Sequence, residues 1–392
     1  MKPYADYFNW EGMLLAGLYA LLLLFILWGI SARLLNNQRE RIITCIGFIF
    51  LCLFSAFAAC SSLFPYFPDT IMFAELVELN ENHHQALGVI LYFMVSLPLR
   101  LISFFQIEVY LVFQQFIFVL ALLFLWQAWK IHSQQKNAYP GMYEIFFLLA
   151  LLYPSTLLFI TIPLREFIQI LGFCIFLYGL AKFIYFNKLG WMVIGGVITL
   201  FVRPQLVIFY PFLILLAKHK NLLKLGIYGL AALPFAVLLF ESIARYKFKV
   251  SWFAYVRNAG VKRYYDSGMT YGTVEWDNFG DVILDIPVLA LQFILSPLPI
   301  LHSVNPLNLL MLFLDLCFVL VVLFGAFSVK KSISGLHIKL FLFSAVLFSV
   351  WEFYIGGAVR HRYPLVLMLI PIAGMYYSII LSNLLSSRFS RK

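Results

Sequence analysis

Charged side chains are scarce in this sequence. Only 12% of the 392 residues are Asp, Glu, Lys or Arg, against about 25% in an average soluble domain, and 63% are apolar. A chain with so little polar surface cannot cover a water-soluble fold of this length, so its expected solvent is lipid. One bilayer crossing takes about 20 apolar residues. We therefore predict a single membrane domain over residues 1–392 that crosses the bilayer many times.

Acidic residues and paired cysteines are also few. The chain has 28 Lys and Arg against 18 Asp and Glu, but the basic residues form small clusters between apolar runs, as retained cytoplasmic loops do, which argues against nucleic acid as a partner. The cysteines lie inside apolar runs, with no CxxC pair and no Cys/His spacing of a metal site. They are predicted to be packing thiols: Cys45, Cys52, Cys60, Cys174 and Cys317.

Long apolar runs bounded by Lys, Arg, Pro or Gly dominate what remains. They predict an all-α, polytopic membrane protein with about 11–13 transmembrane helices. Two runs, 86–104 and 284–300, contain helix-disturbing prolines, and the sequence leaves open whether they cross or lie at the membrane edge. The other predicted spans are 12–32, 42–64, 105–129, 141–162, 165–187, 189–203, 204–217, 222–241, 308–329, 337–357 and 362–386.

The charges between the predicted spans are sorted by side. Alternate connections hold basic clusters such as Arg33, Arg39 and Arg41, whereas the opposite connections hold most of the acids. The positive-inside rule then predicts an inner-membrane protein with its N-terminus on the outer side and its C-terminus in the cytoplasm. Two outer-face segments are long, about 65–106 and 245–307. Both are rich in aromatic residues, so we expect them to be ordered over the membrane.

Several arginines stand at the outer ends of predicted spans: Arg165, Arg203, Arg360 and Arg362. A charge at the centre of the hydrocarbon costs about 2.5–3.5 kcal/mol on insertion scales, and less near the interface, so such residues usually have a partner or a function. They could anchor helix ends by snorkelling to headgroups. All four lie on the outer side, opposite the cytoplasmic side on which basic anchors usually lie. As a group they therefore indicate a phosphate-binding role, because guanidinium groups bind phosphate bidentately. Asp315, an acid inside a span, is expected to meet an Arg or a water-filled cavity.

Asp69 and His361 are the candidate catalytic residues. Asp69 follows the end of a predicted span and could accept a proton from a sugar hydroxyl. It could also be no more than a helix N-cap, a role that does not exclude catalysis. His361 stands between two arginines and could be a base, a phosphate ligand or a surface histidine. No pattern supports a bound metal, and we expect no cofactor, with a divalent cation as the open alternative. Secondary site candidates are Glu166, Lys262, Arg263 and His84.

The order of these motifs resembles the GT-C superfamily of membrane glycosyltransferases, in particular the bacterial O-antigen and exopolysaccharide (Wzy-like) polymerases. The resemblance covers most of the chain and depends on four short motifs: FPDTIMFAEL, LYPSTLLFITIPLREFIQILGF, TLFVRPQLVIFYPFLI and GGAVRHRYPLVLMLIPIAG. The chain departs from the family in lacking the paired acidic motif of many members, which puts metal dependence in doubt. An extra span also precedes the aspartate loop.

The resemblance implies transfer of a sugar or glycan from a polyprenyl-phosphate or polyprenyl-diphosphate carrier at the periplasmic face, with inversion. Asp69 would be the base, and the four outer arginines would stabilise the departing phosphate. Membrane lipid and a glycan-assembly complex are further expected partners. The alternative function is a lipid-linked glycan flippase. A flippase would be expected to have polar residues along the whole path to the cytoplasm and often repeat symmetry, and the sequence has no internal repeat. A structural subunit would leave the arginines without a ligand.

Overall fold

The computed structural model describes residues 4–61, 68–79, 87–133, 141–203, 207, 210–218, 249–264, 269–298, 306–329 and 331–389. Over these residues the chain is helical, with one isolated β-bridge between Thr270 and Tyr354 and no strand. Six of the described helices are long and apolar enough to cross a membrane. The predicted all-α, polytopic fold is confirmed.

The chain divides into two compact units. Unit 1 contains residues 1–210, 321–333 and 367–392, and unit 2 contains residues 211–320 and 334–366. Each unit has its own buried polar side chains.

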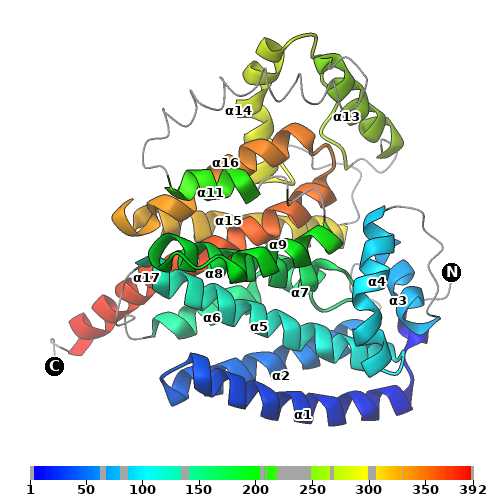
Figure 1. Ribbon diagram of the computed structural model, residues 1–392, viewed down its shortest axis with the longest axis vertical. Coiled ribbons are helices and arrows are strands. Elements are labelled where there is room, and N and C mark those ends of the chain that lie inside the picture. The colour runs from blue at the N-terminus through cyan, green and yellow to red at the C-terminus, as the bar shows by residue number, and fades with distance from the viewer. Residues whose placement is uncertain are drawn as a thin grey trace. The chain divides into compact units, whose positions relative to one another are not determined.

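Three long helices form the N-terminal part of unit 1: α1 (Trp10–Leu34), α2 (Gln38–Cys60) and α5 (Ile107–Ser133). A short 3-10 helix, η1 (Tyr4–Tyr7), precedes them. Asn9 caps α1, because its side chain accepts a hydrogen bond from the Gly12 N–H. The three helices pack against one another and lie side by side in Figure 1. Their bounds agree with the predicted spans to within a few residues.

The predicted outer segment 65–106 contains two helices, α3 (Pro68–Glu78) and α4 (Leu87–Ile102). Helix α4 has 16 residues and continues through Pro98, so this proline does not break it. Sixteen residues are fewer than the roughly 20 needed to cross the hydrocarbon. The buried guanidinium of Arg100 donates to the carbonyl oxygens of Phe93, on the same helix, and of Leu76, at 2.6 and 3.4 Å. Arg100 thereby ties α4 to α3.

The predicted span 141–162 is two helices rather than one. Helix α6 (Met142–Leu152) ends at Tyr153, and the short α7 (Pro154–Phe159) begins with proline at its first position. Proline has no N–H to donate, and its ring clashes with the carbonyl four residues earlier, so a continuous helix through Pro154 is disfavoured. The break leaves the irregular residues 160–165 before the next helix.

Helices α8 (Glu166–Phe186) and α9 (Gly190–Val202) pack closely. A Cβ atom at Gly179 would lie 2.0 Å from the Met192 backbone nitrogen. Small residues at such contacts let two apolar helices approach in a membrane, where dispersion and not the hydrophobic effect holds helices together. Helix α11 (Tyr210–Lys218) begins with Tyr210, whose ring stacks on Phe176 of α8 with centroids 3.8 Å apart.

The remaining helices are α13 (Val250–Tyr264), α14 (Phe279–Leu295), α15 (Pro306–Ser328), α16 (Lys331–Trp351) and α17 (Ile355–Phe389). The first two lie in the predicted outer segment 245–307, and α14 continues through Pro287. Its start is fixed by Asn278 and Asp281, which form a capping box; backbone N–H donors lower the pKa of Asp281. The predicted span 222–241 lies outside the described residues.

Candidate functional site

In unit 2, His361 forms a close pair with Glu352. His361 Nδ1 lies 2.5 Å from Glu352 Oε2, and the imidazole stacks on Phe348 at 5.5 Å between ring centroids. An ionised carboxylate only accepts hydrogen bonds, so Nδ1 carries a proton in this pair, and in the neutral imidazole Nε2, across the ring, has the lone pair. A carboxylate that fixes the tautomer and an aromatic ring that fixes the plane orient His361 as a general base requires.

The backbone around Glu352 explains its position. Glu352 follows the last residue of α16, and its carboxylate reaches the beginning of α17, where Oε1 accepts from the Tyr354 N–H at 3.3 Å. A Cβ atom at Gly357 would lie 2.3 Å from Oε1, so only glycine leaves room for the carboxylate there. The positive end of α17 stabilises its negative charge.

Arg257 of α13 also reaches Glu352. Its guanidinium donates to the carbonyl oxygens of Glu352 and Ser349, and Nε is buried with no hydrogen-bond partner among the described residues. Burial lowers the pKa of Arg257 to about 10, against the opposing effect of the Glu352 carboxylate, so the side chain stays protonated at neutral pH. Arg257 is therefore a buried cation that contacts Glu352, the residue that pairs with His361.

Tyr271 lies in the same cluster. Its hydroxyl donates to the Gln292 carbonyl oxygen at 3.2 Å and interacts with the Ser296 side chain. Burial raises its pKa, although the charges of Arg362 and Arg257 act in the opposite direction, so Tyr271 is a neutral phenol at neutral pH.

Arg362 is fully buried beside Asp315. Its Nη2 lies 2.6 Å from Asp315 Oδ2, and neither side chain is exposed. Nη1 donates to the carbonyl oxygens of Phe293, Ile294 and Ser296, at the end of α14. The predicted pairing of Asp315 with an Arg is confirmed. Through these bonds the guanidinium of Arg362 holds α14, α15 and α17 together. Arg362 therefore has a structural role in unit 2.

The other basic candidates of unit 2 differ in exposure. Arg360 is half-buried next to His361, on the first turns of α17. Lys262 and Arg263 are exposed in the last turn of α13. An exposed cation at a helix C-terminus favours the helix through its dipole, so these two have a structural explanation as well.

In unit 1, Arg203 and Glu166 form a buried ion pair. Arg203 Nη2 lies 2.8 Å from Glu166 Oε1, and the side chains are 5% and 1% exposed. Arg203 is the C-cap of α9, and Glu166 is the first residue of α8. Arg165, the N-cap of α8, is half-buried beside them. The structure thus brings three of the predicted residues together at the adjoining ends of two helices.

Two glutamines support this corner. Gln114 Nε2 donates to the carbonyl oxygens of Ile160 and Ile162, and Gln115 Nε2 donates to that of Ile160. All these groups are buried, and irregular backbone at membrane depth is tolerated only where protein or water satisfies it. The glutamines therefore stabilise the irregular residues that lead to Arg165.

Asp69 lies in the first turn of α3, after Pro68, so it is not the N-cap of this helix. One turn later, Phe73 packs edge-on against Tyr92, with ring centroids 5.1 Å apart. The Tyr92 hydroxyl lies 2.5 Å from that of Tyr110, and both Arg100 and Glu166 act on Tyr92 electrostatically. The helix that carries Asp69 thus packs on the same polar cluster as Glu166.

Sequence reasoning missed Glu352, Arg257 and Tyr271. The available signal was an acid at the end of an apolar run, in VWEFYIGG, close before the motif that contains His361. His84 lies outside the described residues. In the part of the chain that is described, no three His, Cys, Asp or Glu side chains gather as a metal site would require.

Comparison with protein-family models, curated proteins and solved structures finds no match to this chain. The fold and its apolar helices define a multi-pass helical membrane protein. Within each unit, oppositely charged residues meet as a buried pair: Arg203 with Glu166 in unit 1, and Arg362 with Asp315 in unit 2.

Proposed function

We propose that this protein is a membrane glycosyltransferase of the GT-C type. It transfers a sugar or glycan from a polyprenyl-phosphate or polyprenyl-diphosphate carrier, at the periplasmic face of the bacterial inner membrane, and most resembles the polysaccharide polymerases. The orientation follows from the sorting of charges between spans. The observation that supports catalysis most is the His361–Glu352 pair, with the buried cation Arg257 beside it.

The reaction uses His361 as general base. Its Nε2 takes the proton of an acceptor hydroxyl while that oxygen forms a bond to the anomeric carbon of the donor. The bond from this carbon to the carrier phosphate breaks, and the phosphate leaves with the electron pair. Arg257 and Arg360 stabilise its added charge, since guanidinium groups match phosphate oxygens in geometry. Glu352 then stabilises the imidazolium, as a carboxylate does in hydrolase triads.

This assignment shifts roles among the predicted residues. Arg362 serves to hold the helices around the site, because its donors go to Asp315 and to three carbonyl oxygens. Arg203 and Glu166 act in unit 1, where their pairing positions Arg165. These residues therefore affect the transfer rate indirectly, by holding the helices of their units in place.

Asp69 is the second candidate for the base, and its replacement by Asn separates the two. Asn keeps the size of Asp but cannot act as a base. We assign Asp69 a structural role: it lies in the first turn of α3, where its negative charge stabilises the helix through the helix dipole. We expect Asp69→Asn to keep more than about a tenth of the transfer rate, since general-base loss costs about 10²–10⁴-fold. Transfer between lipid-linked glycans in proteoliposomes measures it.

Glu78→Gln is the matched control, because Glu78 is an exposed acid on the same helix. A loss of 10²–10⁴-fold in Asp69→Asn alone, with normal membrane abundance, would give the role of base to Asp69 and leave His361 with a binding role.

A further inference from the structure

Helix α14 of unit 2 has an exposed apolar face. Several of its apolar side chains are more than half exposed: Ile283, Leu284, Val288 and Leu291. The last three follow one another at the four- and three-residue spacing that places side chains on one side of a helix. The opposite side is buried through Leu289, which packs in a core with residues of α13. A contiguous apolar face on a folded chain marks an interaction surface.

The carbonyl oxygens in the last turn of α14 bond to protein groups. A helix leaves its last four carbonyl oxygens without partners inside the helix. In α14 they accept from the Arg362 guanidinium, the Tyr271 hydroxyl and the Leu298 N–H. The oxygens belong to Gln292, Phe293, Ile294 and Leu295. Hydrocarbon has no water to supply such donors, so a helix that ends at membrane depth must be satisfied in this way.

The same end of α14 lies beside a helix long and apolar enough to cross the membrane. Arg362 Nη2 lies 2.6 Å from Asp315 Oδ2 of α15. Asp315 is about 14 Å along α15 from its first residue, Pro306, at about 1.5 Å per residue. This is about half of the roughly 30 Å of hydrocarbon. Helix α14 has 17 residues and is about 25 Å long, which is enough to reach water from this depth but not to cross.

The beginning of α14 is polar. Asp277 and Asn278 are exposed, and Asn278 forms the capping box with Asp281 in the first turn. Asp285, in the next turn, accepts from the Trp276 indole at 2.8 Å, and no charged residue follows it in α14. The charges of α14 therefore lie towards one end, as expected of a helix that enters lipid from water.

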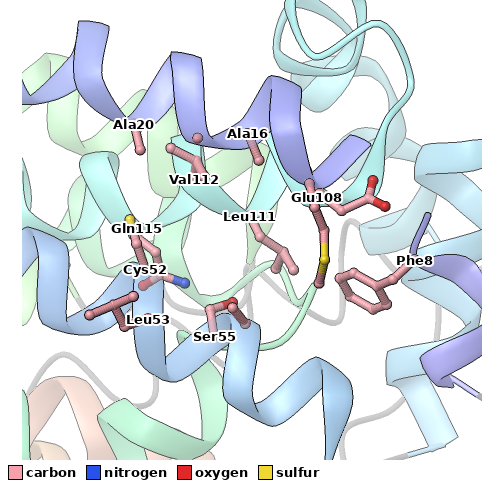
Figure 2. A pocket seen from close by; sticks show the side chains of 13 residues that line it. Phe8, Ala16, Ala20, Cys52, Leu53, Ser55, Glu108, Leu111, Val112 and Gln115 are labelled. Atoms are coloured by element: carbon pink, nitrogen blue, oxygen red, sulfur yellow. The ribbon is translucent and has the colours of Figure 1, made fainter. Parts of the chain in front are cut away.

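Helix α1 of unit 1, one of the six helices long enough to cross, has the same pattern. Leu14, Leu18 and Leu21 are more than half exposed, at the spacing of the exposed residues of α14. On the other side of α1, Ala16 and Ala20 line the apolar groove against α2 and α5 that Figure 2 shows. A helix with one packed side and one exposed apolar side is thus how this chain meets lipid.

We propose that α14 is a re-entrant helix, which enters the outer leaflet from water and ends inside it, and that its exposed face binds the acyl chains of phospholipids. Acyl chains are the partner because the inner end of α14 lies at the depth of Asp315 in α15. Trp252 and Tyr255 of α13 are more than half exposed and lie near the headgroups, where such rings are enriched. The insertion does not depend on the transfer reaction.

Cysteine variants test the depth of α14. A membrane-impermeant maleimide reacts with the thiolate, and hydrocarbon both excludes the reagent and disfavours the charged thiolate. In lipid nanodiscs, Thr273→Cys, in the exposed segment before α14, should be labelled fast. Leu284→Cys should be labelled more slowly. Leu291→Cys and the control Leu18→Cys in α1 should both be labelled at least about tenfold more slowly than Thr273→Cys.

Mass spectrometry of each labelled peptide keeps the native cysteines apart from the new ones. Labelling of Leu291→Cys as fast as that of Thr273→Cys would place α14 in water and overturn the proposal.

A photoactivatable lipid distinguishes acyl chains from protein as the cover of this face. The nanodiscs contain phosphatidylglycerol with a trace of the same lipid carrying a diazirine in the middle of its acyl chain. The unchanged protein should give crosslinks in α14 as well as in α1. Slow labelling of Leu291→Cys without lipid crosslinks in α14 would mean that protein, such as a second copy of this chain, covers the face, and would also overturn the proposal.

Discussion

His361→Gln is expected to lower the rate of glycan transfer by about 10²–10⁴-fold, because the amide of Gln cannot take up the proton of the acceptor hydroxyl. Glu352→Gln should cause a loss of similar order. Its amide can donate to Nδ1, which favours the tautomer with the proton on Nε2 and so removes the lone pair from the reacting side of the ring. Initial rates in proteoliposomes with a polyprenyl-linked glycan donor measure both variants.

His132→Gln is the control for these variants, since His132 is a half-buried histidine at the end of α5 in unit 1 and contacts Tyr185. It should retain the normal rate. Full activity of His361→Gln, at normal abundance in the membrane, would exclude His361 as the base. A loss in His361→Gln with no loss in Glu352→Gln would show that Glu352 does not set the tautomer.

Arg362→Met should destabilise the protein by about 3–5 kcal/mol, because it removes the cation that pairs with the fully buried Asp315 carboxylate. Three carbonyl oxygens at the end of α14 also lose a donor. Asp315→Leu should have an effect of the same order, since it leaves the guanidinium without its carboxylate. The change is measured by heating the detergent-solubilised protein and monitoring its unfolding by size-exclusion chromatography.

The double variant Arg362→Met with Asp315→Leu should be more stable than either single variant, because both buried charges are gone. Arg39→Met is the control: Arg39 pairs with Glu144 at 2.9 Å, but its side chain is 72% exposed, and exposed pairs contribute about 0–1 kcal/mol. Single variants of Arg362 and Asp315 that unfold at the same temperature as Arg39→Met would contradict the structural role of the buried pair.

Much of the fold can be predicted because lipid imposes a simple rule on sequence. Helices α1, α2, α5 and α8 lie within a few residues of the predicted spans, since apolar runs must end where charges begin. Prolines were less informative. Pro154 breaks the predicted span 141–162, whereas α4 and α14 continue through theirs, and hydropathy alone does not distinguish the two cases.

The candidate site could be predicted only in part. The sequence shows where charges stand at the ends of spans, but not which of them meet. Arg203 and Glu166 are 37 residues apart, and Arg362 and Asp315 are 47 apart, so no helical periodicity relates them. Glu352 was missed because one acid at the end of an apolar run resembles an ordinary helix end. Its position depends on Gly357, which leaves room for its carboxylate at the start of α17.

The central claim is that the protein transfers glycan from a polyprenyl carrier, and lipid-linked glycan analysis tests it most directly. The strain should lack the endogenous protein and produce the unchanged chain, His361→Gln or neither. With His361→Gln we predict that donor glycan accumulates on its carrier at the periplasmic leaflet, and that the unchanged chain removes it. Donor that remains at the cytoplasmic leaflet without the protein would indicate a flippase. If the lipid-linked glycans are the same in the strain with the unchanged chain and in the strain with His361→Gln, the proposed function is contradicted.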